Sequence, residues 1–366
     1  MNELQGNSTT EGGLPKRKML FLRLKRKFLS HVWLARLEIL FGILVGFTLI
    51  FVLLSTLVTK THLLDYAKIA GDFIFTPVSK IKSSDRRVNL LIMGKAGAEH
   101  AGADLTDTMI FTSISLVNPK IVLISIPRDI WISAIRAKIN SAYYWGNQKE
   151  PGGGLTLAKS TVEEIVGQPV HYGLVLDFNG FMQIIDVLGG INLTVERAFV
   201  DEKYPIAGRE NDLCGGDTEF KCRYEILKFE AGGQKMDGET ALKFVRSRNA
   251  QGDEGTDLAR EARQTKVITA IREKVFTAEV LLSPPKLFGI WRVLKDSMVT
   301  DLGPSEAAIV IRRLIGARNN IGSNVLSEEF LENPPISGRY DNQYVFIPKA
   351  GNWKEVQAWV ASLVKN

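Results

Sequence analysis

After residue 86, two hydrophobic patterns alternate along the chain. Short apolar runs are typical of strands, and segments whose apolar residues recur every three or four positions have the period of a helix. The expected strands are Val88–Met93, Met109–Leu116, Ile121–Ile126, Tyr172–Phe178, Ile191–Val195 and Tyr344–Ile347. The expected helices are Leu155–Val166, Phe181–Leu188, Gly238–Val245, Leu258–Phe276, Pro304–Ala317 and Asn352–Val364. Because strands and helices alternate, the pattern predicts an α/β fold with a mixed central sheet covered by helices on both faces. Residues 196–235 are expected to be irregular.

A different pattern precedes this domain. Residues 39–58 read ILFGILVGFTLIFVLLSTLV, twenty positions without a charge, which is the length of a bilayer-spanning helix. A buried helix of a soluble core is the alternative, but helices this long and apolar on every face are rare there. The apolar region of a cleaved signal peptide is shorter, and no small-residue cleavage site follows. We therefore expect an uncleaved, single-pass transmembrane helix ahead of the α/β domain.

The charge distribution sets the expected orientation of this anchor. The 366 residues include 46 Lys+Arg and 40 Asp+Glu, a net charge of +6, and residues 1–38 with eight basic and three acidic residues supply +5 of it. Basic residues ahead of a span favour a cytoplasmic N-terminus. The expected organisation is a cytoplasmic tail (1–38), an anchor (39–58), a stalk (59–85) and an extracytoplasmic catalytic domain (86–366) in the cytoplasmic membrane. With about +1 left for that domain, nucleic acid is not an expected partner.

Composition narrows the chemistry further. The chain is 45% apolar, too apolar for a disordered protein, and contains neither a P-loop nor a Gly-x-Ser-x-Gly motif. Four scattered histidines make a His-rich metal site unexpected. Cys214 and Cys222 are eight positions apart, and outside the membrane they are expected to form a loop-closing disulfide. A two-thiol metal site is the less favoured alternative, because no histidine lies nearby.

Two segments at predicted strand ends carry candidate chemistry. Asp104 and Asp107 lie in the loop sequence GADLTDT, where two carboxylates three positions apart could bind a divalent cation or could serve only as turn and capping residues. Arg128 follows an apolar strand, and the strand ends of α/β sheets are where ligands bind. The alternative for Arg128 is a surface ion pair with Asp129.

A cluster of arginines indicates an anion site. Four of them occur within 18 residues across a Gly/Asp-rich turn: Arg246, Arg248, Arg260 and Arg263. Guanidinium groups bind phosphate oxygens in bidentate fashion and stay charged, and a helix start adds N–H donors. A solvated charged face would be served equally well by lysine, yet all four are arginine. With the carboxylates, they predict a pyrophosphate site with room for Mg²⁺, suited to phosphoryl transfer without a covalent nucleophile. Outside a membrane, where ATP is absent, the activated phosphates are lipid-linked pyrophosphates.

Several motifs, in this order and spacing, resemble those of the LytR-CpsA-Psr family. They are LTDTMI (105–110), SIPRDIWI (125–132), KINSAYYWG (138–146), the stretch 161–195, MDGETALKFVRSR (236–248) and DLAREARQ (257–264). The resemblance implies an α/β/α fold with an apolar pocket, and transfer of a phosphoglycan from a polyprenyl-pyrophosphate carrier to peptidoglycan with Mg²⁺. The glycans handled by the family include teichoic acids, capsular polysaccharide and arabinogalactan. We expect the 181–188 helix to line the pocket.

The resemblance also implies roles for single residues. Asp107 and Arg128 would be catalytic, and Asp107 would bind the metal. The pyrophosphate-binding residues would be Arg128, Arg246, Arg248, Arg260 and Gln264, with Asp257 in the same motif.

This chain departs from the family pattern at two points. Leu105 stands where the family has arginine, and the turn after the first strand lacks an acid. Asp104 is the candidate for the missing carboxylate and second metal ligand, and Lys95 or His100 for the missing charge. A lipid-pyrophosphate pyrophosphatase and a non-catalytic wall-binding or regulatory module are the alternative functions.

Overall fold

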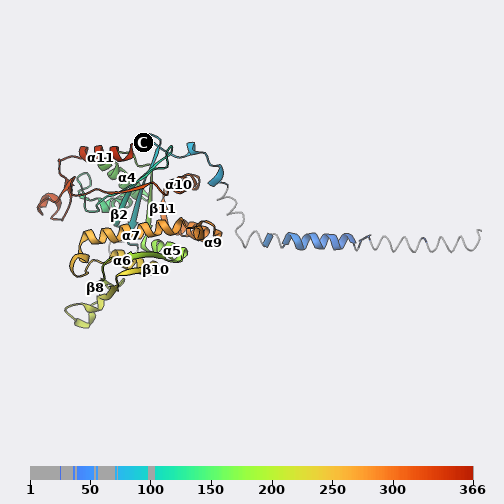
Figure 1. Ribbon diagram of the computed structural model, residues 1–366, viewed down its shortest axis with the longest axis horizontal. Coiled ribbons are helices and arrows are strands. Elements are labelled where there is room, and N and C mark those ends of the chain that lie inside the picture. The colour runs from blue at the N-terminus through green and yellow to red at the C-terminus, as the bar shows by residue number, and fades with distance from the viewer. Residues whose placement is uncertain are drawn as a thin grey trace, which may run out of the picture. The chain divides into compact units, whose positions relative to one another are not determined.

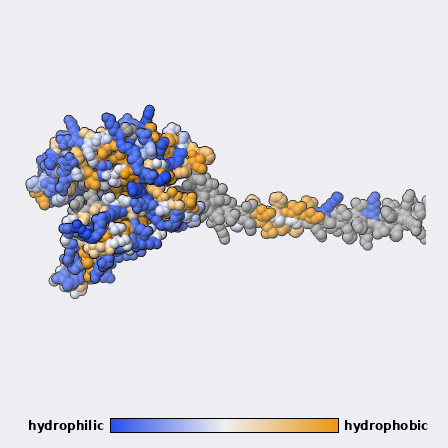
Figure 2. All heavy atoms as spheres, viewed as in Figure 1, coloured by the Kyte–Doolittle hydropathy of each residue, from blue (hydrophilic) through white to orange (hydrophobic). Residues whose placement is uncertain are grey.

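The computed structural model describes Lys25 and residues 36–37, 39–52, 55–56, 71, 73–97 and 104–365. The chain divides into two compact units, one up to Lys68 and one from Ile69 onward. In the first unit, residues 39–52 and 55–56 of the expected anchor are helical, and their apolar side chains are exposed (Figure 2). Within the described part of the chain, however, no helix is both long and apolar enough to cross a bilayer. The transmembrane anchor therefore stays a prediction.

The second unit is built on a six-stranded mixed sheet with the order β11-β6-β1-β2-β3-β12. Two of its strands, β2 and β11, are labelled in Figure 1. Its strands are β1 (Arg87–Lys95), β2 (Thr106–Ser115), β3 (Ile121–Ser125), β6 (Tyr172–Asp177), β11 (Met298–Thr300) and β12 (Ile321–Val325). β1 is parallel to β6 and antiparallel to β2, and β3 is antiparallel to β2 and parallel to β12. Consequently β1, β6, β3 and β12 all end at one edge of the sheet, where β2 begins.

Alternation along the strands places one apolar core on each face of the sheet. Leu91 and Met93 of β1 pack with α4 (Gly153–Val166) and α11 (Lys354–Val364) on one face. Val88 and Leu90 pack with α10 (Pro304–Gly316) on the other. Successive strand side chains point to opposite faces, so each helix layer takes every second residue. Helices on both faces of a mixed sheet are thus confirmed.

A second core lies beside the sheet and builds the arginine-bearing part of the domain. Its aromatic and aliphatic residues come from α5 (Phe178–Leu188), α6 (Gly238–Arg246), α7 (Asp257–Val275), β7 (Ile191–Val195) and β10 (Gly232–Met236), and from the ribbon of β8 (Phe199–Pro205) and β9 (Tyr224–Phe229). α8 (Ala278–Leu281) and α9 (Pro284–Ser297) follow α7, and α9 contacts α5. β7 pairs with β10 and not with the central sheet.

Some sequence predictions were wrong. Residues 196–235 are irregular only in part: β8, β9 and β10 form there, whereas residues 206–223 between β8 and β9 hold only turns and two short 3-10 helices. The exposed ribbon carries many charged residues, which hid its alternation. The patterns also missed α9 and α3 (Ala142–Lys149), which packs closely on α4 where Gly146 faces Gly153. The late strand is reduced to the two residues of β14 (Ile347–Pro348), which pair with β13 (Leu331–Glu332), and β4 (Trp131–Ile132) and β5 (Ala137–Lys138) form a short hairpin.

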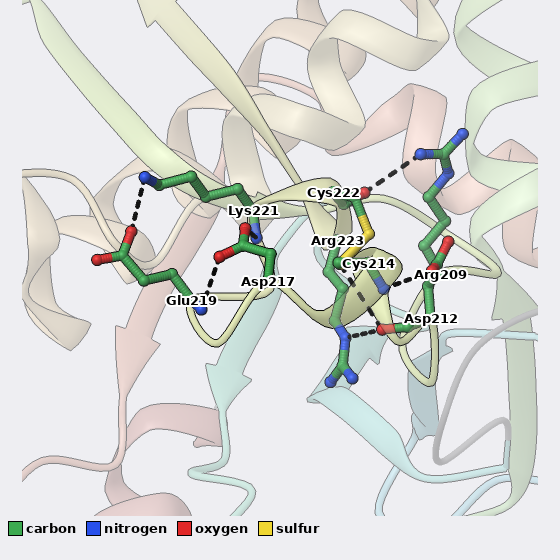
Figure 3. The surroundings of a disulfide bond; sticks show 8 residues. All are labelled: Arg209, Asp212, Cys214, Asp217, Glu219, Lys221, Cys222 and Arg223. Carbon is green, nitrogen blue, oxygen red and sulfur yellow. Dashed lines mark hydrogen bonds and ion pairs between the residues drawn. A yellow bond between two sulfur atoms is a disulfide. The ribbon is translucent and has the colours of Figure 1, made fainter.

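The end of the β8–β9 ribbon is closed by a disulfide between Cys214 and Cys222 (Figure 3). Polar contacts within the loop support it: Arg209 donates to the Cys222 carbonyl oxygen, and Arg223 donates to that of Asp212. The surface of the ribbon's end is mostly hydrophilic (Figure 2), although Leu213 is 75% exposed. The ribbon therefore projects a small, cross-linked loop away from the second core.

Removing this disulfide should loosen the loop and leave the rest of the domain folded. Closing a loop of this size lowers the conformational entropy of the unfolded chain and so stabilises the folded state by at most about 2–3 kcal/mol. In a Cys214→Ser/Cys222→Ser variant we expect faster proteolytic cleavage between residues 206 and 223, with the unfolding midpoint of the domain lowered by no more than about 5 °C. Limited proteolysis with mass spectrometry measures this, with reduced wild-type protein as the control. Unchanged cleavage would contradict the structural role.

His171 ties the residues before β1 to the sheet. Its Nδ1 accepts the Asn89 N–H at 2.9 Å, so the neutral ring carries its proton on Nε2, which lies 3.0 Å from the Ser84 hydroxyl. Burial lowers the pKa of His171; the nearby Glu163 opposes this effect, whereas Lys159 and Lys82 add to it. The folded protein thus favours the neutral ring.

This lowered pKa predicts a loss of stability in acid. Near the ordinary histidine value of about 6.5, the unfolded chain takes up a proton before the folded chain does. The contribution of His171 is therefore complete above that pH and is lost as the pH falls through the folded-state pKa. Chemical denaturation between pH 7.5 and 5 should show a shallower pH dependence for His171→Gln than for the wild type. Identical slopes would contradict the assignment.

Candidate functional site

The strand order brings segments that are distant in sequence to one edge of the central sheet. Lys95 at the end of β1 is opposite Thr106 of β2 on one side and Asp177 of β6 on the other. Arg128 follows the end of β3, whose last residue, Ser125, is opposite Ile110 of β2. The beginning of β2 and the ends of β1, β3 and β6 therefore surround the edge that the sequence predicted as a ligand site.

Arg128 and Asp107 form an ion pair at this edge. Arg128 Nη1 donates to Asp107 Oδ1 at 2.5 Å, and the side chains are 24% and 37% exposed. Arg128 Nε lies 3.4 Å from Asp129 Oδ2. Among the described residues this buried Nε has no hydrogen-bond acceptor. Burial opposes the charged guanidinium, but the carboxylates of Asp107 and Asp129 outweigh it and raise the pKa of Arg128. Arg128 is a permanent, largely buried cation with donor capacity to spare.

Two lysines extend the network. Lys95 Nζ lies 2.8 Å from Asp104 Oδ1 and 5.7 Å from the centre of the Tyr143 ring. Lys138 Nζ, from β5, lies 2.7 Å from Asp129 Oδ1. Within this network three carboxylates, of Asp104, Asp107 and Asp129, offset three cations. A pyrophosphate placed there would need further positive charge, from other arginines or from a metal ion.

Arg246 approaches from the second core. Its guanidinium carbon lies 4.6 Å from the centre of the Phe178 ring, and Nη1 donates to the Tyr204 hydroxyl at 3.4 Å. Burial raises the pKa of Tyr204, although Arg246 acts in the opposite direction. Phe178 begins α5 directly after Asp177, the last residue of β6, whose carboxylate caps the helix by accepting the Gly180 N–H. Arg246 is therefore positioned at the end of β6, next to β1.

The remaining predicted residues have different environments. Arg248 is exposed, and Arg260 and Gln264 are half-buried, one turn apart on the same side of α7. Arg263, by contrast, is 3% exposed and donates to three carbonyl oxygens, those of Phe244, Ser247 and Glu254. Its grouping with the phosphate-binding arginines was therefore wrong: its donors are used inside the protein.

Comparisons with known proteins show the family of this chain. A profile of the LytR_cpsA_psr family matches residues 59–361. The chain belongs to this family. It is 30% identical over 267 residues to the polyisoprenyl-teichoic acid–peptidoglycan teichoic acid transferase TagU of Oceanobacillus iheyensis, covering 68% of this chain and 73% of TagU. Regulatory protein MsrR of Staphylococcus aureus is 25% identical over 225 residues, 60% of this chain and 59% of MsrR.

The fold is shared with solved structures. The solved structure of TagT bound to LI-WTA matches 79% of this chain and 96% of TagT, with a TM-score of 0.52 and 20% identity, which shows a shared fold. In this LytR_cpsA_psr domain, two of the candidates for the groups that the family pattern has and this chain lacks form an ion pair. Asp104, one residue before Leu105, is paired with Lys95. His100, the other candidate for the missing charge, lies outside the described residues.

Sequence patterns missed several residues of the site. Lys138 lies inside the KINSAYYWG motif, so the sequence marked its position. Its pairing with Asp129 could not be predicted from the motif. Phe178 and Tyr204, which contact Arg246, gave no signal because aromatic residues in strands and helix starts are ordinary core formers.

The fit of a magnesium ion rests on the carboxylates at the edge. Mg²⁺ is commonly held by one or two carboxylates together with substrate phosphates. Asp107 fits such a ligand, since it is one-third exposed and bonds Arg128 through one oxygen, Oδ1. Among the described residues, three potential ligand groups converge only at Asp212, Cys214 and Cys222, and the disulfide removes both thiolates. A metal site at the cysteines is thereby disfavoured.

Proposed function

We propose that this protein is a membrane-anchored phosphotransferase that moves a phosphoglycan from a polyprenyl-pyrophosphate carrier onto peptidoglycan or a similar wall acceptor. Membership of the LytR_cpsA_psr family supports a glycopolymer transferase, as does the likeness to a relative named as a teichoic acid transferase. The observation that carries the proposal is the Asp107–Arg128 pair at the sheet edge, with Arg246 at the end of β6, on the other side of β1.

These residues suit the chemistry of phosphoryl transfer. Arg128 and Arg246 would bind the pyrophosphate oxygens and hold the glycan-bearing phosphorus in place. An acceptor hydroxyl attacks this phosphorus, the bond to the bridging oxygen breaks, and polyprenyl monophosphate leaves. Asp107 would take the hydroxyl proton. When bound, Mg²⁺ supplies the positive charge that the balanced edge network lacks, held by Asp107 with Asp104 as the second candidate ligand.

Partly exposed apolar side chains offer a place for the polyprenyl tail. α5 contacts both α7 and α9, and the three helices lie close together in Figure 1. Their apolar residues are nevertheless half-buried in many places: Met182, Ile184, Val187, Ile271, Val275, Phe288 and Trp291. Covering such surfaces with lipid is favourable by about 0.8 kcal/mol per buried CH₂ group. We propose that the tail lies along these helices, close to Arg246.

The compartment follows from the proposed anchor. With residues 39–58 in the cytoplasmic membrane and the basic residues 1–38 inside, the catalytic domain would be extracytoplasmic, beside its lipid donor and the wall acceptor. The disulfide between Cys214 and Cys222 is consistent with an oxidising compartment.

The decisive experiment gives the purified full chain a labelled polyprenyl-pyrophosphate-linked glycan, with and without peptidoglycan and with and without Mg²⁺. Label on peptidoglycan, lost with chelator, supports the proposal. Release of labelled glycan phosphate to water without acceptor would favour the pyrophosphatase. Wall binding with an unchanged donor would favour a regulatory module, the role named for the relative MsrR.

A further inference from the structure

The loop after α6 combines an exposed arginine with a completely buried serine. Arg246 ends the helix, Ser247 is 0% exposed, and Arg248 is exposed again. Two guanidinium groups that are to bind one anion need a fixed backbone between them.

Asp201 holds the loop from the β8 side. This carboxylate is 0% exposed, and its Oδ2 accepts the Ser247 hydroxyl at 2.7 Å and the backbone N–H groups of Arg248 and Asn249 at 3.0 and 3.1 Å. Its Oδ1 accepts the Lys203 N–H at 3.0 Å. The backbone of Asp201 also forms a bridge with Ala250. The buried Asp201 carboxylate is thus hydrogen-bonded entirely by donors of the protein.

Arg263 holds the same loop from the α7 side. Its Nη2 donates to the Ser247 carbonyl oxygen at 2.7 Å and its Nε to the Phe244 carbonyl oxygen at 3.1 Å. Its guanidinium carbon lies 4.8 Å from the centre of the Phe199 ring. Burial lowers the pKa of Arg263, and Glu254 and Asp201 partly offset this effect.

We infer that Asp201 is a positioning residue for the pyrophosphate-binding arginines, with Arg263 as its counterpart on the other side of the loop. The inference rests on the proposed function, in which Arg246 binds pyrophosphate, and on the same role that the family resemblance implies for Arg248. A buried charge is unfavourable unless it is paired and hydrogen-bonded. Both charges bond to the segment from Phe244 to Asn249, and each has one further partner, the Lys203 N–H for Asp201 and Glu254 for Arg263. Arginines on a fixed backbone bind an anion without first losing conformational freedom.

The test replaces Asp201 with Asn in the full chain, which keeps the side-chain size but replaces an acceptor oxygen with a donor. We expect amide hydrogen exchange at Arg248 and Asn249 to accelerate at least tenfold. The Kd for farnesyl pyrophosphate should rise at least tenfold, and KM should rise for the lipid-linked donor but not for the acceptor. The matched control is Asp237→Ala, which removes the cap at the other end of α6, where Asp237 accepts the Thr240 N–H. It should leave exchange in the loop and the Kd unchanged.

Ser247→Ala is the milder variant, because it removes only the hydroxyl bond and leaves both backbone bonds to Asp201. It should raise both the exchange rates and the Kd about threefold. If Asp201→Asn does not fold, this variant tests the inference in its place. Wild-type exchange and wild-type Kd in the folded variants would overturn the inference. If the wild type itself fails to bind farnesyl pyrophosphate, the proposed function fails, whereas the exchange rates still show whether Asp201 fixes the loop.

Discussion

Replacing Arg128 with lysine should lower glycan transfer about a hundredfold or more, although the net charge is unchanged. A lysine ammonium is a compact charge that cannot contact Asp107 and a phosphate group in the planar fork of a guanidinium. Removing one preorganised donor from a developing charge commonly reduces kcat by about 10²–10³. Transfer of labelled glycan to peptidoglycan by purified wild-type and Arg128→Lys protein measures the effect.

The chain offers a matched control for this substitution. Arg136 Nη2 lies 2.6 Å from Asp341 Oδ1, much like the Arg128–Asp107 pair, but the Arg136 side chain is 65% exposed. Exposed pairs contribute little, so Arg136→Lys should transfer at the wild-type rate. Equal rates for Arg128→Lys and wild type would contradict the proposed site.

Replacing Asp107 with Asn should remove at least about 99% of Mg²⁺-dependent transfer while the fold persists. The amide can still accept a hydrogen bond from Arg128, but it is a poor metal ligand and cannot take a proton from the acceptor hydroxyl. General-base catalysis alone commonly contributes about 10²–10⁴. The fold should tolerate the substitution, because the Asp107 side chain is 37% exposed. Its partner Arg128 keeps a carboxylate neighbour in Asp129.

Titrating Mg²⁺ against the transfer rate gives the sharpest comparison for Asp107→Asn. The wild-type rate should rise and saturate, whereas the variant should stay near the rate in chelator. Asp341→Asn is the control, because it neutralises the acid of the exposed pair and should follow the wild-type curve. A variant that saturates at the wild-type rate would exclude Asp107 as metal ligand and as base.

Part of the site could be predicted from local sequence. Arg128 follows an apolar strand and Asp107 precedes one, and strand ends are visible in the hydrophobic pattern. Their pairing could not be predicted this way, because it depends on β3 lying next to β2 with antiparallel direction. The same holds for Lys138, whose partner Asp129 lies across a short hairpin.

The arginines show where residue type is an incomplete guide. Arg246 and Arg263 are identical in type and near each other in sequence, and both were plausible phosphate ligands. The two differ in burial: Arg263 is buried and donates to carbonyl oxygens on either side of Arg246 in the sequence. Asp201 was missed altogether, because charged residues dominate the ribbon around it and an acidic residue gives no sign in the sequence that it faces inward.

The amino-acid sequence by itself determined the α/β class, most strand and helix positions of the central sheet, and the family, since these depend on local periodicity and on ordered motifs. Only the tertiary structure decided that Asp107 bonds Arg128, that Arg246 lies at the end of β6, and that Asp201 and Arg263 fix the loop between Arg246 and Arg248. The physical reason is that strand order and burial are set by packing between distant segments. Those interactions decide whether a charged side chain faces a ligand or holds the protein together.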